Sequence, residues 1–273
     1  MKKKITIIGA GNIGTAIAGG LASSNSYSAS DITLTRRRLP LIEPWAEKGF
    51  KITSDNNEAV SGSDIVIIAV EPQQLDGVLA DIKPSLDPEK HILISVVSGV
   101  SIRLIKRMTG EKLPVVRAMP NTAISIGQSM TCICADVEET EALELTKSIF
   151  ATVGKTIVIM EEQMTAATAL CACGIAFFLR SIRAASQGGT EIGFHAHEAL
   201  EMAAQTAKGA ASLLANRENH PEFEIDRVTT PRGCTISGLN EMEHGGLSSA
   251  MIKGILVSAT KAEHLYKKSN GEG

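Results

Sequence analysis

Short runs of β-branched and other apolar residues recur through the first part of the chain. These runs cover residues 5–8, 32–35, 65–70, 92–97 and 115–119. Continuous apolar runs of this length predict strands that are covered on both faces, as in a parallel sheet. Helical spacing of apolar positions is found between them, at residues 12–22, 73–82 and 102–108. This alternation predicts a doubly wound α/β domain of the Rossmann type.

The pattern changes near Glu161. Two further strands, at residues 130–134 and 156–160, are expected on either side of a helix at 138–150. After them come long alanine-rich stretches with helical spacing at 162–185, 197–214 and 247–266, and Glu161-Glu162 is expected to be the charged start of the first. We therefore predict two domains, a nucleotide-binding domain at 1–160 and an all-helical domain at 161–273. The first two long helices carry few charges, so we expect their apolar surface to be buried against another chain.

A glycine-rich turn follows the first predicted strand and opens the first helix, with the sequence Gly9-Ala10-Gly11-Asn12-Ile13-Gly14. This is the context in which a GxGxxG motif indicates a dinucleotide site. Gly9 would form the tight turn, Gly11 would let the backbone approach a pyrophosphate, and Gly14 would let helix and strand pack closely. The amides of the helix N-terminus would then hold the phosphate charge. The alternative is a plain strand-to-helix turn.

The end of the second predicted strand bears on the choice of cofactor. A site for NAD usually has Asp or Glu there to bind the ribose hydroxyls, whereas this chain has Thr35-Arg36-Arg37-Arg38. Guanidinium groups suit a 2′-phosphate, so we predict NADPH, with NADH as the alternative, and expect one of the arginines to be solvated. The loops at 69–72 and 95–99 follow later strands and should border the ribose and the nicotinamide.

Composition excludes several classes of function. The 273 residues have a formal net charge of −3 and only 3% aromatic residues, which argues against nucleic-acid binding. The five cysteines do not form a disulfide framework and indicate reduced thiols in a cytoplasmic protein. Their spacing offers no metal site. The apolar stretch at 164–179 is shorter than the ~20 residues that span a bilayer, so we expect no membrane contact.

Several segments together identify a resemblance that covers nearly the whole chain. In the first domain they are the glycine turn, 69–73 (AVEPQ) and 117–122 (RAMPNT); in the second they are 228–239 (VTTPRGCTISGL) and 218–221 (ENHP). These segments resemble the pyrroline-5-carboxylate reductase family. The resemblance implies reduction of the cyclic imine Δ1-pyrroline-5-carboxylate to L-proline, the last step of proline biosynthesis. It also implies a helical dimerisation domain, and dimers that join into larger rings such as decamers.

The resemblance also implies site residues by position. Substrate would be bound by Glu218, Val228, Thr230, Gly233, Cys234 and Thr235. Cofactor would be bound by Ile8, Gly9, Ala10, Gly11, Asn12, Ile13, Thr35, Arg36, Asn56, Ala69, Val70, Glu71, Pro72, Val97, Ser98 and Asn121. Of these, Asn56 would join Thr35 and Arg36 near the adenosine ribose, and Val97, Ser98 and Asn121 would lie near the nicotinamide.

The chain departs from the family pattern in three places. Residues 171–177 read CACGIAF where the family usually has SGSGPAY, Arg232 stands at a usual glycine, and Glu71 stands at a usual lysine. The first change alters a helix that lines the substrate pocket. Arg232 is either a solvated loop residue or a second contact to the substrate carboxylate. Glu71 removes a positive charge near the cofactor.

The chemistry requires a held carboxylate and a protonated ring nitrogen. Free amides at residues 230–235 would attract the carboxylate. The Thr235 hydroxyl is our candidate catalytic group because it can hydrogen-bond the ring nitrogen; its alternative role is helix capping. Glu218 would stabilise the iminium charge. The proton itself would come from water or from substrate that is already protonated.

Two other functions fit the architecture. A β-hydroxyacid-dehydrogenase-like oxidoreductase would need a lysine on the helix after the domain junction, and residues 164–178 contain none. A non-catalytic NADPH-binding regulator is favoured by the altered segment at 171–177.

Overall fold

The computed structural model describes residues 3–215 and 220–266 and divides the chain into two compact units. Unit 1 comprises Met1–Cys173 and Ser258–Gly273, and unit 2 comprises Gly174–Val257. Residues 161–173 and the C-terminal segment therefore belong to the unit that contains the sheet. The domain boundary near Glu161 stays a prediction.

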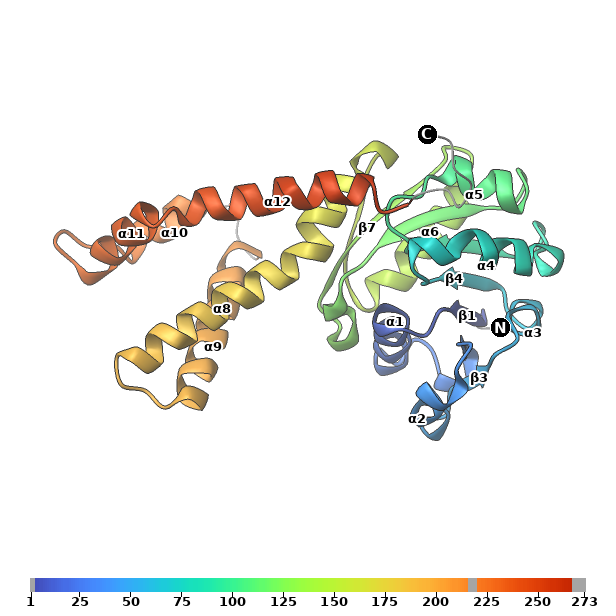
Figure 1. The fold of residues 1–273 in the computed structure, drawn as a ribbon, viewed down its shortest axis with the longest axis horizontal. Helices are drawn as coiled ribbons and strands as arrows, with labels where there is room; N and C mark the ends of the chain where they lie inside the picture. The colour runs from blue at the N-terminus through green and yellow to red at the C-terminus, as the bar shows by residue number, and fades with distance from the viewer. Residues whose placement is uncertain (1–2, 216–219, 267–273) are drawn as a thin grey trace. The chain divides into compact units, whose positions relative to one another are not determined.

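Unit 1 is built on a sheet that has eight strands within the described residues, in the order β3-β2-β1-β4-β5-β6-β7-β8 (Figure 1). The strands are β1 (Ile5–Ile8), β2 (Ile32–Thr35), β3 (Lys51–Thr53), β4 (Ile65–Ile68), β5 (Ile92–Ser95), β6 (Val115–Met119), β7 (Ser129–Ala135) and β8 (Gly154–Val158). Alternate residues of each central strand enter different apolar clusters: Ile65 and Ile67 belong to one, and Val66 and Ile68 to the other. Both faces of the sheet are thus buried, as the continuous apolar runs predicted.

The helices of unit 1 account for these two buried faces. They are α1 (Asn12–Ser23), α2 (Glu43–Glu47), α3 (Asn56–Ser61), α4 (Leu75–Ile82), α5 (Ile102–Thr109), α6 (Thr140–Ala151) and α7 (Met164–Ala167). Ile17 and Leu21 of α1 pack in the first cluster, while Leu75 and Leu79 of α4 pack in the second. The predicted α/β fold is confirmed.

The five strands that the apolar runs predicted to be parallel do pair in parallel, whereas no direction was predicted for the strand that follows them. Strand β7 pairs antiparallel with β6, although β8 again pairs parallel with β7. The reason is the connection: β6 and β7 are joined through the short turn η5 (Thr122–Ile126), and a parallel pair needs a crossover of a dozen or more residues. Apolar content alone does not record strand direction.

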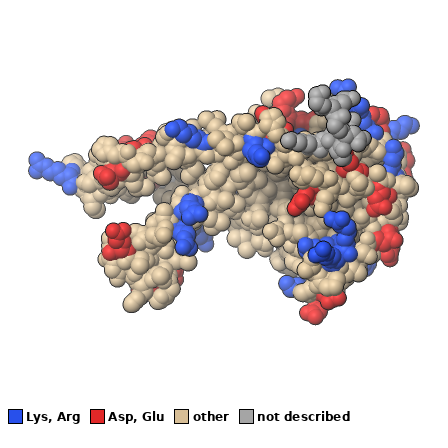
Figure 2. Space-filling model, in the orientation of Figure 1, with Lys and Arg blue, Asp and Glu red and all other residues tan. Residues whose placement is uncertain are grey.

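Unit 2 is helical. Its elements are α8 (Gly174–Glu191), α9 (Ala196–Ala215), α10 (Pro221–Arg227), α11 (Cys234–His244) and α12 (Leu247–Glu263), the last of which continues into unit 1. The short helix α10 was not predicted, whereas α11 is the helix into which the turn at 230–235 was expected to lead. Many large apolar side chains are exposed here, among them Phe178, Leu200, Met242, Ile252 and Leu256. The face shown in Figure 2 has few charged residues over these helices, so unit 2 exposes a largely apolar surface.

The helical run from Glu161 to Glu191 is longer than the apolar stretch seen in the sequence. At 31 residues it is long and apolar enough to cross a membrane, judged by length and composition only. A single helix of this kind is weak evidence, because interface and core helices have the same composition. The expected lack of membrane contact stays a prediction.

Candidate nucleotide site and substrate turn

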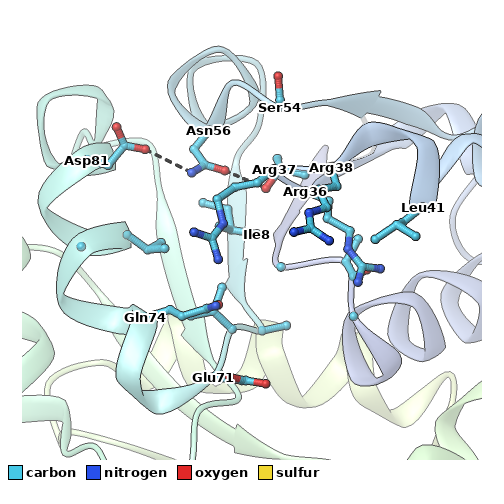
Figure 3. Close-up of a pocket in the computed structure, with 18 of the residues that line it drawn as sticks. Ile8, Arg36, Arg37, Arg38, Leu41, Ser54, Asn56, Glu71, Gln74 and Asp81 are labelled. Atoms are coloured by element: carbon cyan, nitrogen blue, oxygen red, sulfur yellow. Dashed lines mark hydrogen bonds between the residues drawn. The ribbon is translucent and has the colours of Figure 1, made fainter.

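A cavity of about 1040 Å³ lies in unit 1 at the carboxyl ends of β1, β2 and β4. Open α/β sheets bind ligands at this edge. Ten of the residues predicted to hold the cofactor line it: Ile8, Gly9, Ala10, Gly11, Thr35, Arg36, Asn56, Ala69, Val70 and Glu71. The structure therefore brings segments from four separate parts of the chain into one cavity (Figure 3).

The glycine turn has the geometry that a bound pyrophosphate requires. Gly9 has φ +98°, and a Cβ there would lie 2.6 Å from the Ala69 carbonyl oxygen. A Cβ on Gly14 would collide with the Gly9 carbonyl oxygen, so helix and strand pack in direct backbone contact. A Cβ on Gly11, in contrast, would meet nothing within 4 Å and would occupy cavity space.

The N-terminus of α1 is open to a ligand. Gly11 is its N-cap, and within the described residues no side chain caps the helix. The first amides of a helix lack intrahelical partners, and together with the helix dipole they bind anions. The residues present therefore fit a dinucleotide phosphate.

A chain of hydrogen bonds orders the end of the cavity next to β2. The Thr35 hydroxyl donates to Asn56 Oδ1 at 2.7 Å, and Asn56 Nδ2 donates to Asp81 Oδ2 at 3.1 Å, as the dashed lines in Figure 3 mark. The Arg36 guanidinium donates from Nη1 to the Ala10 carbonyl oxygen at 3.0 Å. Arg36 is half-buried, whereas Arg37 and Arg38 are exposed. Arg36 is thus held against the glycine turn with donors left over for an anion.

Six predicted cofactor residues do not line this cavity. Asn12 and Ile13 form the first turn of α1, and Pro72 begins the turn η3 (Pro72–Gln74). Val97 and Ser98 follow β5, and Ser98 Oγ lies 3.9 Å from Met119 Sδ. Asn121 follows β6, and hydrogen bonds hold both its backbone and its side chain. Its amide nitrogen donates to Ser129 Oγ, its Nδ2 donates to the Cys171 carbonyl, and its Oδ1 accepts from the Ala123 amide, each at 3.1 Å.

Sequence reasoning missed one wall of the cavity. Gln74, Gly77, Val78 and Asp81 come from α4 and the turn before it, and all line the cavity. Their spacing of three, four and seven residues is that of one helix face, which is the signal that could have found them. Asp81 matters most, because it sets the orientation of the Asn56 amide.

The predicted substrate turn lies in unit 2, between α10 and α11. Val228 is the C-cap of α10 and is 64% exposed. The Gly233 amide donates to the Thr230 carbonyl at 2.9 Å and closes the turn. Gly233 is the N-cap of α11, and Cys234 is exposed at the first position of that helix. Glu218 lies outside the described residues.

Thr235 is not the cap of α11. That position belongs to Gly233, which provides no side-chain cap, and Thr235 is the second residue inside the helix. Its side chain is partly exposed and makes no hydrogen bond to the described part of the chain. The hydroxyl is therefore free to bind a ligand, and the helix-capping alternative is wrong.

Among the described residues, no cluster of three or more His, Cys, Asp or Glu side chains is arranged to hold a metal ion.

Comparisons with known proteins give matches in both units. A family model described as pyrroline-5-carboxylate reductase dimerisation matches residues 161–265, and one described as NADP oxidoreductase, coenzyme F420-dependent, matches residues 4–99. Pyrroline-5-carboxylate reductase 1 of Dictyostelium discoideum is 54% identical over 96% of this chain, which spans 50% of that relative's length. A pyrroline carboxylate reductase of Plasmodium falciparum, solved with NADP bound, has the same fold (TM-score 0.89, 24% identity, 97% of this chain and 99% of that one).

A second relative matches over nearly the full length of both chains. Pyrroline-5-carboxylate reductase 2 of Dictyostelium discoideum is 50% identical over 95% of this chain and 92% of its own length. Because relatives that are 54% and 50% identical cover nearly the whole of this chain, it belongs to the pyrroline-5-carboxylate reductase family of NAD(P)H-dependent oxidoreductases.

Proposed function

We propose that this chain reduces Δ1-pyrroline-5-carboxylate to L-proline with NADPH as the preferred hydride donor. The observation that carries the proposal is the cavity of unit 1, where an uncapped helix N-terminus, an open Gly11 and a fixed arginine lie together. The bound nicotinamide supplies the hydride. The residues of the chain bind the cofactor and the substrate and orient them toward each other.

The preference for NADPH rests on charge near the end of β2. Three arginines line the cavity there, and Arg36 is fixed by its bond to the Ala10 carbonyl. Asp81 is also in the cavity, but its carboxylate accepts hydrogen bonds from the Asn56 and Asn57 amides. Arginine binds phosphate oxygens in a bidentate manner. The Plasmodium falciparum relative was solved with NADP bound, which supports the same cofactor class.

Replacing Arg36 with glutamate should raise the Michaelis constant for NADPH by about 10- to 100-fold, because a charge-assisted hydrogen bond contributes roughly 1.5–3 kcal/mol. Kinetics with NADH should change little. Initial rates with each cofactor measure both effects. Arg38→Glu, on the same turn but exposed, is the matched control and should have a smaller effect. An equal loss with NADPH and NADH would mean that Arg36 only supports the glycine turn through Ala10.

The substrate carboxylate is proposed to bind at the turn before α11. This helix of 11 residues begins with amides that no side chain caps among the described residues, and such amides attract anions. Thr230, Gly233 and Cys234 form this turn, and Val228 would supply an apolar contact. Thr235 is proposed to hydrogen-bond the ring nitrogen and hold the iminium in place. Glu218 would add a negative charge nearby.

Arg232 has a backbone conformation that suits the glycine usually found at this position in the family that the sequence resembles. Its φ is +60°, in the left-handed region that a side chain disfavours. Arg232→Gly should raise the free energy of unfolding by about 1 kcal/mol, or the melting temperature by roughly 2–4 °C. Thermal unfolding measures this, with Arg232→Ala as a control that removes the guanidinium and keeps the strain. A rise in substrate KM for both variants would show that Arg232 binds the carboxylate.

A direct assay tests the proposed function. Purified protein is mixed with NADPH and pyrroline-5-carboxylate, and the loss of cofactor absorbance is followed, then repeated with NADH. A regulator would bind NADPH in a fluorescence titration and show no imine-dependent oxidation. A β-hydroxyacid dehydrogenase would instead oxidise hydroxyacids with NADP.

We further propose a cytoplasmic homodimer that assembles into a larger ring such as a decamer. The exposed apolar surface of unit 2 supports burial against a second copy. A groove of about 590 Å³ between α8 and α12, with Phe177, Met242 and Leu247 in its wall, belongs to that surface. Light scattering on the purified protein measures the assembly; a monomer at working concentration would contradict it.

A further inference from the structure

Two cysteines far apart in the sequence meet in unit 1. Cys132 lies on β7, and Cys171 lies in the π-helical segment η7 (Thr168–Cys173). Their sulfur atoms are 3.8 Å apart. Of the other cysteines, Cys134 is buried, Cys173 is partly buried and Cys234 is exposed. The spacing of the cysteines does not predict this pair. Residues 132–134 and 171–173 each have the pattern Cys-x-Cys, and each segment contributes one cysteine to the pair.

We propose that Cys132 and Cys171 form a reversible disulfide, a redox modification site next to the loop that carries Asn121. A disulfide needs sulfurs about 2 Å apart, so the two atoms must approach by roughly another 2 Å. A π-helical turn departs from the regular ladder of the α-helix and is often found at functional sites. The movement that brings the two sulfur atoms together is therefore expected in segment η7, because the β-sheet that carries Cys132 is more rigid.

The two thiols have different parts in the oxidation. Cys171 is half-buried, whereas Cys132 is 3% exposed. The contact between the two thiols lowers the pKa of Cys171, while the same contact and burial raise the pKa of Cys132. Thiolate is the reactive form. Cys171 is therefore the attacking sulfur and Cys132 the resolving one.

A small peroxide can serve as the oxidant. The Cys171 thiolate attacks one oxygen of hydrogen peroxide, the O–O bond breaks, and hydroxide leaves to become water, which gives a sulfenic acid. The Cys132 sulfur then attacks the Cys171 sulfur, the S–O bond breaks, and the hydroxyl leaves as water with the Cys132 proton. In total two thiols and one peroxide give one disulfide and two waters. A dithiol reverses the step by thiol–disulfide exchange.

The position of the pair connects it to the proposed reaction. Asn121 Nδ2 donates a hydrogen bond to the Cys171 carbonyl oxygen at 3.1 Å. A shift of the Cys171 backbone would therefore displace the acceptor that orients the Asn121 side chain. If Asn121 borders the nicotinamide, oxidation should lower turnover. This consequence rests on the proposed function, but the disulfide itself does not.

Peptide mapping tests the disulfide without any activity. The full-length reduced protein is treated with limiting hydrogen peroxide, free thiols are blocked, and tryptic peptides are analysed without reductant. Cys132 falls in the peptide 118–147 with Cys134, and Cys171 falls in the peptide 156–180 with Cys173. We expect these two peptides to be joined, with the loss of two hydrogens, and to separate after dithiothreitol.

Cysteine variants identify which sulfur atoms form the disulfide. Cys173→Ser and Cys134→Ser are the matched controls and should keep the cross-link, whereas Cys171→Ser and Cys132→Ser should lose it. Serine at 171 is the residue of the resembling family, so this variant should fold, which its melting temperature checks. The proposal is overturned if the cross-link survives in Cys171→Ser, or if wild-type Cys171 proceeds to sulfinic acid with the peptides unjoined. Turnover of each variant before and after peroxide then reports the effect on the reaction separately.

Discussion

Glu161→Ala should lower the free energy of unfolding by about 3 kcal/mol, the low end of the cost of breaking a buried ion pair. Glu161 Oε1 accepts from Arg117 Nη1 at 3.1 Å and from the Ile102 amide at 2.7 Å. The Arg117 side chain is 7% exposed and that of Glu161 30%. The variant would leave a buried guanidinium without its counter-charge and the Ile102 amide, at the start of α5, without its acceptor. We place the value at the low end because Glu161 retains some contact with solvent.

Thermal unfolding measures this effect, and a loss of this size corresponds to roughly 6–12 °C in melting temperature. Glu162→Ala is the matched control, since Glu162 is exposed at the neighbouring position. Glu161→Gln should fall between the two, because the amide oxygen still accepts from Ile102 while the charge is lost. Equal melting temperatures for the Glu161 and Glu162 variants would show that the Arg117 pair adds no stability.

Thr235→Ala should lower kcat by about 100-fold, the low end of the loss expected when one hydrogen-bonding group that stabilises the transition state is removed. The physical reason is that its hydroxyl is proposed to hold the ring nitrogen of the substrate. The affinity for NADPH should change little, because Thr235 lies outside the nucleotide cavity of unit 1. Steady-state kinetics and a fluorescence titration with NADPH measure the two quantities.

Two further variants make this result specific. Thr235→Ser keeps the hydroxyl and should recover most of the activity. Ser237→Ala removes an exposed hydroxyl from the same helix, whose oxygen lies 3.3 Å from the Gly233 carbonyl, and should behave like the parent protein. A parallel loss of turnover and of NADPH binding in Thr235→Ala would assign Thr235 a structural role.

Local patterns were sufficient for much of unit 1. The apolar runs predicted the central strands because burial on both faces demands apolar residues at every position, as at Ile65 to Ile68. The glycine turn was also predicted from the sequence, because Gly9 and Gly14 lie where a Cβ would contact backbone atoms. Strand β3 was missed because its three residues are partly exposed and carry no continuous apolar run.

The sequence could not supply contacts that depend on how distant segments align. Glu161 was expected to favour its own helix through the dipole, and it does begin the turn η6 (Glu161–Gln163), but its carboxylate binds Arg117 and the start of α5. Asp81 was overlooked because nothing near it in the chain indicates that Asn56 would lie beside it. The left-handed backbone of Arg232 likewise appears only in the folded turn.

The amino-acid sequence by itself therefore determined the α/β class, the dinucleotide turn and the family, because each depends on residue types at short and fixed spacings. The tertiary structure alone decided the antiparallel β7, the hydrogen bonds from Thr35 through Asn56 to Asp81, and the meeting of Cys132 with Cys171. The physical reason is range: periodicity reports which face of an element is buried, whereas register and strand direction decide which side chains from remote segments come within bonding distance.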